Sequence, residues 1–172
     1  MPGVNAKGAY FTRGSGHNRF GQYTEDSAEY QEVLDRLSRK FATAKTLVPP
    51  AILVGPGSRD AGILSIGSCD GAITEALGVL AERGIRLDYL RVLAFPFGTE
   101  VEDFLSRHSI VYVVEQNRDA QLRSLLTLET AVEKSKLRSI LHYDGMPLAA
   151  NFIVRAIEDA LGTGERRTAA SN

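Results

Sequence analysis

Three polar side chains that could orient a ligand or a partner protein follow one apolar run of the sequence. Glu115, Asn117 and Gln121 come after residues 110–114, a continuous and largely β-branched segment typical of a buried strand. A carboxylate and two amides at the end of such a strand can hold a partner loop or a ligand by hydrogen bonds. A competing interpretation makes Asn117 a helix cap and leaves the other two side chains in solvent. The sequence leaves both interpretations open.

A second candidate site is the turn GSCDG, which follows another apolar run. Its glycines, Gly67 and Gly71, permit a sharp turn, and the free amides at the start of the next helix could hold an anion. The turn matches neither the dinucleotide fingerprint nor the Walker motif, no lysine follows it, and Asp70 would repel a phosphate. A tight structural turn is therefore favoured. The alternative is a small-molecule site for coenzyme A or a nucleotide at Gly67, Ser68 and Gly71.

The cysteine and the histidines show no catalytic or metal-binding motif in the sequence. Cys69 lies near a helix start, where its thiol could be activated, but no catalytic partner accompanies it, so a small buried cysteine is favoured. A single cysteine excludes an internal disulfide and an all-cysteine metal or iron-sulfur site within these residues. His17, His108 and His142 show no metal-ligand spacing and are interpreted as structural. We therefore predict no catalytic residue and no metal ligand.

The elements that position these residues alternate between strand and helix. Strand patterns are expected at residues 51–54, 61–66, 85–93, 110–114 and 137–141, the last of them peripheral. Strands joined by helices through short connections predict a three-layer α/β/α sandwich with a mostly parallel sheet. In such folds ligands meet the carboxyl ends of the strands. Three stretches are expected there: residues 67–71, 93–98 and 115–121.

Helix patterns lie between and after the strands. The helix after GSCDG is expected to stop at Gly84, and Thr99 with Glu102 forms a capping box for the next one. Another helix is expected at residues 119–129. Pro147 is expected to be the first residue of the last helix. That helix should turn five apolar residues inward: Phe152, Ile153, Ala156, Ile157 and Leu161.

The first fifty residues have a different character. An irregular arm precedes a helix that begins after Asp26, with Glu29 placed to complete the cap, and runs to about Ala44. One face of that helix carries Tyr30, Val33, Leu34, Leu37 and Phe41. A Pro-Pro pair then marks a linker. We expect an arm, helix and linker at residues 1–50, one α/β domain at 51–162 and a disordered tail at 163–172.

Composition excludes several classes of protein. The chain has 172 residues, 44% of them hydrophobic, and a formal net charge of -1, which gives no electrostatic footprint for nucleic acid or an anionic membrane. No apolar run approaches the roughly 20 residues of a membrane span, and the first residues lack a signal-peptide pattern. We therefore expect a cytoplasmic protein that binds neither nucleic acid nor membrane.

These motifs together resemble a known family. GILSIGSCDGAITEALGVLAERGIRLDYLRVLAFPFGTEVEDFL, followed by VYVVEQNRDAQLRSLL, is similar to the C-terminal domain of the α subunit of 2-oxoacid:acceptor (ferredoxin) oxidoreductases. The matching positions are Gly67, Ser68, Glu75, Ala76, Gly84, Arg91, Pro96, Phe97, Glu115, Asn117, Gln121 and Leu122. The upstream GSGHNRFGQYTED and the helix containing Arg39-Lys40 also resemble that subunit, so the likeness covers about residues 10–161. It implies a transketolase C-terminal-like fold with one antiparallel edge strand.

The resemblance also implies a function. The complete enzymes oxidatively decarboxylate a 2-oxoacid with coenzyme A, using thiamine diphosphate, magnesium and iron-sulfur clusters, and pass electrons to ferredoxin. We find here no pyrimidine-side carboxylate domain, no diphosphate-binding Gly-Asp-Gly motif and no cluster cysteines. The chain is therefore expected to bind none of these cofactors alone and to be inactive alone. It would be either an excised domain or a piece of a split subunit.

The expected role is assembly of such an enzyme. Partners would be the pyrimidine-binding domain and the thiamine-diphosphate β subunit, with ferredoxin involved only indirectly, and a homodimer is left open. Contact residues would be Glu115, Asn117, Gln121, Pro96 and Phe97. Two alternatives are a stand-alone module that binds coenzyme A or a nucleotide at Gly67–Gly71 and an independent enzyme that uses Cys69. The identity of the 2-oxoacid is left open.

Overall fold

The computed structural model describes residues 3–8, 16–57 and 60–162. Its internal contacts divide the chain into two compact units, Met1–Leu47 and Val48–Asn172. The candidate sites both belong to the second unit.

The first unit contains one long helix, α1 (Ser27–Ala44). Asp26 caps it as expected, because its Oδ1 accepts hydrogen bonds of 2.9 Å from the amides of Ala28 and Glu29. Of the five apolar residues expected on one face, only Val33 is buried. The helix is preceded by a short 3-10 helix, η1 (Ala6–Gly8), and by a turn closed by an antiparallel bridge between His17 and Tyr23. Part of the predicted arm, residues 1–2 and 9–15, lies outside the described residues.

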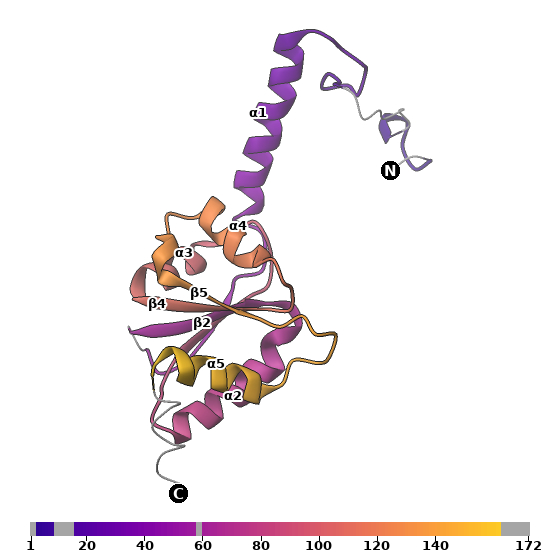
Figure 1. Cartoon of the computed structure of the whole chain (residues 1–172). Coiled ribbons are helices and arrows are strands. Elements are labelled where there is room, and N and C mark those ends of the chain that lie inside the picture. The colour runs from indigo at the N-terminus through magenta and orange to yellow at the C-terminus, as the bar shows by residue number, and fades with distance from the viewer. Residues whose placement is uncertain (1–2, 9–15, 58–59, 163–172) are drawn as a thin grey trace, which may run out of the picture. The chain divides into compact units, whose positions relative to one another are not determined.

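The second unit is built on a five-stranded sheet in the order β1-β3-β2-β4-β5 (Figure 1). The strands are β1 (Ile52–Val54), β2 (Ala61–Ile66), β3 (Asp88–Val92), β4 (Ile110–Glu115) and β5 (Leu137–Leu141). All neighbours run parallel except β1, which pairs antiparallel with β3 at one edge. The mostly parallel sheet, its antiparallel edge strand and the peripheral position of β5 confirm the predicted fold class.

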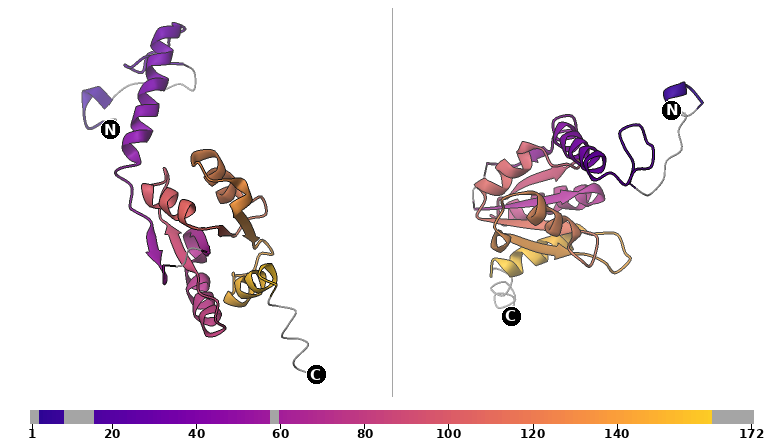
Figure 2. Two further views of the ribbon diagram at one scale, coloured as in Figure 1. Left: turned by 90° about the vertical axis from the view of Figure 1, so that its left-hand side faces the viewer. Right: turned by 90° about the horizontal axis from the view of Figure 1, so that it is seen from above.

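Helices cover both faces of this sheet (Figures 1 and 2). On one face lie α2 (Asp70–Glu82) and α5 (Ala150–Ala160), and on the other lie α3 (Thr99–Arg107) and α4 (Gln121–Glu129). Successive strand residues point to opposite faces. Ile63 and Tyr89 therefore join the core under α2 and α5, whereas Leu64 and Leu90 join the core under α3 and α4. This is the predicted three-layer sandwich.

Several predicted element ends were wrong. Strand β3 is shorter than the expected 85–93, and Gly98 rather than Thr99 is the N-cap of α3, with no side-chain cap bond. The last helix begins at Ala150 instead of Pro147. Phe152 and Leu161, which were expected to face inward, are 40% and 41% exposed. Phe152 meets the His142 ring edge-on at 5.0 Å, and Leu161 is the C-cap residue just past the end of α5.

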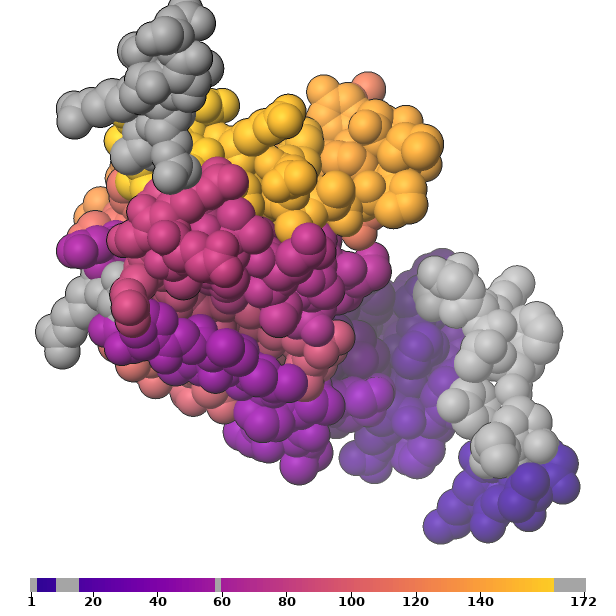
Figure 3. Space-filling view, turned by 90° about the horizontal axis from the view of Figure 1, so that it is seen from below, coloured from indigo at the N-terminus to yellow at the C-terminus, as the bar shows by residue number. Residues whose placement is uncertain are grey.

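Strand β1 projects beyond the helices. Ile52, Leu53 and Val54 are all about half exposed, although they must point alternately to the two sheet faces. Both faces of this edge are therefore uncovered, and β1 lies at the surface of the molecule (Figure 3). Prolines stand at both ends of it, Pro49-Pro50 before and Pro56 after.

Candidate functional site

The loops that carry the predicted site residues meet at the carboxyl ends of three adjacent parallel strands. Ile66 pairs with Val92 and Ser65 pairs with Val114, so β2, β3 and β4 end at the same level. The structure thus brings together residues 67–71, 93–98 and 115–121, as the sequence predicted.

Glu115 is a buried anchor for the start of α4. Its carboxylate, in a residue only 4% exposed, accepts hydrogen bonds from the amides of Leu122 and Arg123 at 2.6 and 3.1 Å. The amide of the Asn117 side chain donates a third bond of 2.8 Å. A negative charge against free amides at a helix N-terminus is stabilising. The carboxylate therefore faces α4 and not solvent, and a role at an interface would act through the loop that it holds.

Asn117 organises that loop from its other side. Its Oδ1 accepts hydrogen bonds from the amides of Asp119 and Gln121, at 3.1 and 3.2 Å. The expected helix start at Asp119 was wrong by two residues, because Ala120 adopts a left-handed backbone conformation (φ 52°) and α4 begins only at Gln121. Gln121 is exposed and contributes its backbone amide here. The N-cap residue of α4 is Ala120, with no side-chain cap bond, so Asn117 is not the helix cap of the competing interpretation, and Glu115, which that interpretation left in solvent, is buried.

The GSCDG segment is a turn that is tied to the Glu115 loop. Gly67–Cys69 form a 3-10 turn, η2, entered through Gly67 at φ +76°. Gln116 donates a 2.9 Å hydrogen bond to the Ser68 hydroxyl and so joins the β2 and β4 loops. Sequence reasoning missed Gln116, whose only signal was its place beside Glu115 at a strand end.

Side chains of β2 and β3 form a polar network with Asp70 of the turn. Tyr89 of β3 donates a 3.2 Å hydrogen bond to Asp70, and its oxygen lies 2.9 Å from the Ser65 hydroxyl. Arg91 lies 3.2 Å from the other Asp70 oxygen, so the charge that was expected to repel a phosphate is paired. Burial raises the pKa of Tyr89 to about 12. No local pattern predicts this network, because its members come from three separate elements, β2, β3 and α2.

Cys69 has the character of a core residue. It is 2% exposed, and burial raises the pKa of its thiol, an effect only partly opposed by a hydrogen bond from Gln116. A raised pKa keeps the thiol protonated and weakly nucleophilic. The prediction of a small buried cysteine is confirmed.

The loop after β3 exposes apolar side chains. Phe97, predicted as a contact residue, is 4% exposed and packs in the core under α3, and Pro96 follows Phe95 through a cis peptide bond. Phe95 itself is 41% exposed and meets the Phe97 ring edge-on at 5.3 Å. Leu93 and Ile66, at the ends of neighbouring strands, are 40% and 41% exposed. The sequence placed Phe95 in the loop after a strand, whereas Ile66 and Leu93 were assigned to strands and their exposure was not predicted.

Comparisons with known proteins place this geometry in a family. No family model matches the chain. Over 161 residues, 91% of the chain, it is 32% identical to 2-oxoacid:ferredoxin oxidoreductase 2, subunit alpha, of Aeropyrum pernix. The chain belongs to the family of 2-oxoacid:ferredoxin oxidoreductase α subunits. It spans about a quarter of that relative, since the match covers 25% of its length.

Solved structures show the same fold. A 2-oxoglutarate:ferredoxin oxidoreductase from Magnetococcus marinus, with 2-oxoglutarate, coenzyme A and succinyl-CoA bound, matches 86% of this chain and 26% of its own with a TM-score of 0.74 and 22% identity. The α chain of a probable 2-oxoacid ferredoxin oxidoreductase from Thermoplasma acidophilum matches 66% of this chain and 97% of its own, with 30% identity and a TM-score of 0.46. The first of these likenesses supports the α/β architecture of this α-subunit domain.

The histidines of the α-subunit domain have structural partners. His108 is 2% exposed, with Nδ1 at 2.7 Å from the Phe104 carbonyl and Nε2 at 3.3 Å from Asp88. His142 has Nε2 at 3.2 Å from Asp144. Within the described residues no three His, Cys, Asp or Glu side chains form a group that could hold a metal ion, and no helix is long and apolar enough to cross a membrane.

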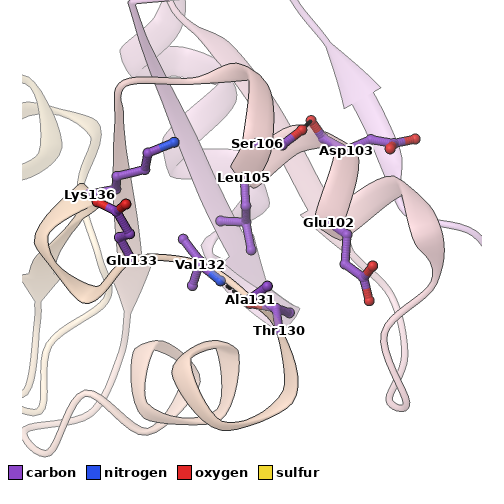
Figure 4. Close-up of a pocket in the computed structure, with 9 residues that line it drawn as sticks. All are labelled: Glu102, Asp103, Leu105, Ser106, Thr130, Ala131, Val132, Glu133 and Lys136. Atoms are coloured by element: carbon purple, nitrogen blue, oxygen red, sulfur yellow. Dashed lines mark hydrogen bonds between the residues drawn. The ribbon is translucent and has the colours of Figure 1, made fainter.

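A separate cavity of about 420 Å³ lies between α3 and the connection from α4 to β5 (Figure 4). Leu105 and Val132 form its apolar floor, and Glu102, Glu133 and Lys136 lie at its rim. None of the site residues predicted from the sequence lines it. It is near the amino ends of β4 and β5, opposite the loops described above.

Proposed function

We propose that this chain is a non-catalytic assembly domain of a 2-oxoacid:ferredoxin oxidoreductase α subunit. In this proposal, the loops at the carboxyl ends of the strands pack against a neighbouring subunit or domain and help to shape the entrance to its thiamine diphosphate site. The complete enzyme would oxidatively decarboxylate a 2-oxoacid to an acyl-CoA in the cytoplasm. Thiamine diphosphate, magnesium and the iron-sulfur clusters would be held by other parts of that enzyme.

The observation that carries this proposal is the exposure of Ile66, Leu93 and Phe95 at the carboxyl ends of β2 and β3. Apolar side chains that are fixed at the ends of strands lose little conformational entropy when a partner covers them. The reactive groups nearby have internal partners, Glu115 with α4 and Cys69 with the core. A surface with apolar contacts and no free nucleophile supports binding to protein more than catalysis.

A role for coenzyme A is proposed from a solved structure with the same fold. The Magnetococcus marinus enzyme has coenzyme A and succinyl-CoA bound. Family membership and this neighbour support an acyl-CoA-forming reaction in the complex to which the present chain would belong. The 2-oxoacid would be selected elsewhere in that complex.

Co-purification tests the assembly role. The tagged chain is expressed in its native host, and proteins recovered with it are quantified by mass spectrometry. Recovery of a thiamine-diphosphate subunit is expected, and Leu93→Asp should reduce it about tenfold or more, because a charge would be buried in the contact. Leu128→Asp, at a leucine on α4 that is 80% exposed, is the matched control. Unchanged recovery for a folded Leu93→Asp chain would contradict the proposal.

A small-molecule module is the second candidate, and one observation favours it. Arg91 pairs with Asp70, so the turn at Gly67, Ser68 and Gly71 is less repulsive to an anion than its sequence predicted. Calorimetric titration with coenzyme A and with ATP would show heat of binding that Arg91→Ala reduces. Absence of heat at millimolar ligand would remove this candidate and leave the assembly role intact.

A further inference from the structure

The chain contains two Asp-Gly pairs, Asp70-Gly71 and Asp144-Gly145, and no Asn-Gly pair. In an Asp-Gly pair the aspartate side chain is readily attacked by the next backbone amide, because glycine has no Cβ to obstruct the approach of its nitrogen. Both pairs follow strands that run parallel in the sheet, one at the start of α2 and the other in the loop after β5. Their surroundings differ in the features that control this attack.

Asp70 is held in a conformation that opposes the attack. It is the first residue of α2, with helical backbone angles (φ -53°, ψ -50°), and its carbonyl accepts a 2.9 Å hydrogen bond from the Thr74 hydroxyl. Both of its carboxylate oxygens have partners, Oδ1 the Tyr89 hydroxyl and Oδ2 the Arg91 guanidinium, each at 3.2 Å. Reaction at this pair therefore requires that the first turn of α2 opens and that these contacts break.

Asp144 lies in an exposed bend outside any helix or strand, and its side chain is 64% exposed. Its Oδ1 accepts a 2.9 Å hydrogen bond from the Met146 amide and lies 3.2 Å from His142 Nε2. A bond from the side chain to the amide two residues ahead folds the carboxyl group back over the Asp144-Gly145 peptide. The other oxygen, Oδ2, has no hydrogen-bond partner among the described residues.

The Gly145 amide is accessible as well. Gly145 is exposed, with φ +84°, and within the described part of the chain its amide donates no hydrogen bond. Apart from its chain neighbours, no atom lies within 4 Å of the position that a Cβ would take at Gly145. The bend therefore has room to bring the amide nitrogen onto the carboxyl carbon without unfolding an element.

We propose that Asp144 is a site of isoaspartate formation in the folded chain. The Gly145 nitrogen bonds to Cγ of the neutral Asp144 carboxyl group, and the carboxyl OH leaves as water with the amide proton. Water then adds to the five-membered succinimide ring. Cleavage of the bond from nitrogen to Cγ restores aspartate, whereas cleavage of the bond from nitrogen to the Asp144 carbonyl carbon gives isoaspartate. One water is released and one is consumed, so no other reactant is needed.

The product changes the loop that contains it. In isoaspartate the main chain runs through Cβ and Cγ, which makes it one methylene longer, and the carboxylate is attached directly to Cα. The original contacts of Oδ1 with the Met146 amide and His142 are then lost. His142 is buried, and its amide donates a 2.9 Å hydrogen bond to the Glu115 carbonyl, so the change reaches the end of β4. The proposal does not depend on the proposed function, since the reaction needs this chain alone.

Prolonged incubation of the full chain in mildly acidic buffer, which favours the neutral carboxyl group, tests the proposal. Trypsin then separates the two pairs, because cleavage after arginine gives residues 60–83 with Asp70 and residues 139–155 with Asp144. Isoaspartate and aspartate have the same mass, so the product is assigned by chromatographic separation and by the methyl group that a protein L-isoaspartate methyltransferase adds. It should form at residue 144 at least about tenfold faster than at residue 70, the ratio set by about 1.4 kcal/mol of local opening at the helix.

The chain unfolded in urea is the matched control. Both Asp-Gly pairs then lack structure, so they should react at similar rates, which separates the effect of the fold from that of the sequence. Asp144→Glu retains the carboxylate but would need a six-membered ring, so residue 144 should give no product, and circular dichroism verifies that the variant folds. A rate at residue 144 no higher than at residue 70 in the folded chain, or product at 144 only after unfolding, overturns the proposal.

Discussion

The two ends of the sheet each hold one buried carboxylate, and they use it differently. At the carboxyl end, Glu115 accepts from amides seven and eight residues ahead in the chain, and so fixes one local loop. At the amino end, Asp88 accepts from the Gly57 amide and faces His108, 31 and 20 residues away. Glu115 accepts hydrogen bonds from the first amides of α4, whereas Asp88 connects strand β3 with the segments that contain Gly57 and His108.

The two ends of the sheet are held rigid by different interactions. The carboxyl end obtains it from hydrogen bonds within a single loop, which leaves the surrounding apolar side chains free to meet a partner. The amino end obtains it from close packing around His108, where Gly62 gives Phe104 room to approach the sheet. Substitutions at the first end should therefore act through lost hydrogen bonds, and substitutions at the second through steric conflict.

The largest effect is expected from Glu115→Ala. The change leaves the amides of Leu122 and Arg123 and the Asn117 side chain without their acceptor, and unsatisfied buried groups are costly. The free energy of unfolding should fall by about 3 kcal/mol in urea denaturation. Glu129→Ala, an exposed residue on the same helix, should change it by less than about 0.5 kcal/mol. Equal losses in the two variants would show that the buried carboxylate does not hold α4.

A steric effect of nearly that size is expected at the amino end. A methyl group on Gly62 would lie 2.5 Å from Phe104 Cζ and 3.2 Å from His108 Cδ2. Gly62→Ala should lower the free energy of unfolding by about 2.5 kcal/mol. Gly78→Ala, on α2 with no atom within 4 Å of the added methyl, should raise it by about 0.5 kcal/mol. Thermal unfolding of both variants checks the opposite signs, and a stabilised Gly62→Ala protein would contradict the packing argument.

High pH should affect the carboxyl end through Tyr89. Burial raises its pKa to about 12 in the folded chain, from 10.0. The folded state thus holds the proton more tightly, so its contribution is complete below pH 10 and is lost as the pH rises toward 12. We expect a loss of roughly 2 kcal/mol from this group. Denaturation at a series of pH values checks this, and Tyr89→Phe should show a shallower decline; identical slopes would refute it.

The smallest effect is expected from Asn117→Ala. It removes two acceptor contacts to the loop amides and one donor to Glu115, all at a half-buried position where water can replace part of them. Stability should fall by about 1 kcal/mol. Gln121→Ala removes an exposed side chain while retaining the amide, and should be neutral. Urea titration distinguishes the two, and a neutral Asn117→Ala would place the rigidity of the loop entirely in Glu115.

The same contrast explains what could be predicted from the sequence. Glu115, Asn117 and the GSCDG turn are local patterns, so their place at the carboxyl ends followed from hydrophobic periodicity and the rules of parallel sheets. The bond from Gln116 to Ser68 spans 48 residues, and the one from Tyr89 to Asp70 crosses from a strand to a helix. No spacing rule predicts such contacts, because they depend on how the layers pack.

Element ends were harder to predict than elements. The start of α4 depends on Ala120, a non-glycine residue in the left-handed region, where the sequence would favour glycine or asparagine. Phe97 was assigned to a contact surface from the family resemblance, and the fold places it in the core. The exposed residues beside it, Leu93 and Phe95, were indistinguishable in the sequence from buried ones. The predicted contact role of the loop residues stays a prediction.

Strand β1 bears on how concentrated solutions of this chain behave. An exposed apolar edge strand is ordinarily a template for aggregation, since further strands can add to its free backbone groups. Here only Ile52, Leu53 and Val54 form the strand, fewer than the six or seven residues of a typical amyloid-forming segment, and a proline at either end cannot donate to an added ladder. The edge therefore ends further growth instead of seeding it.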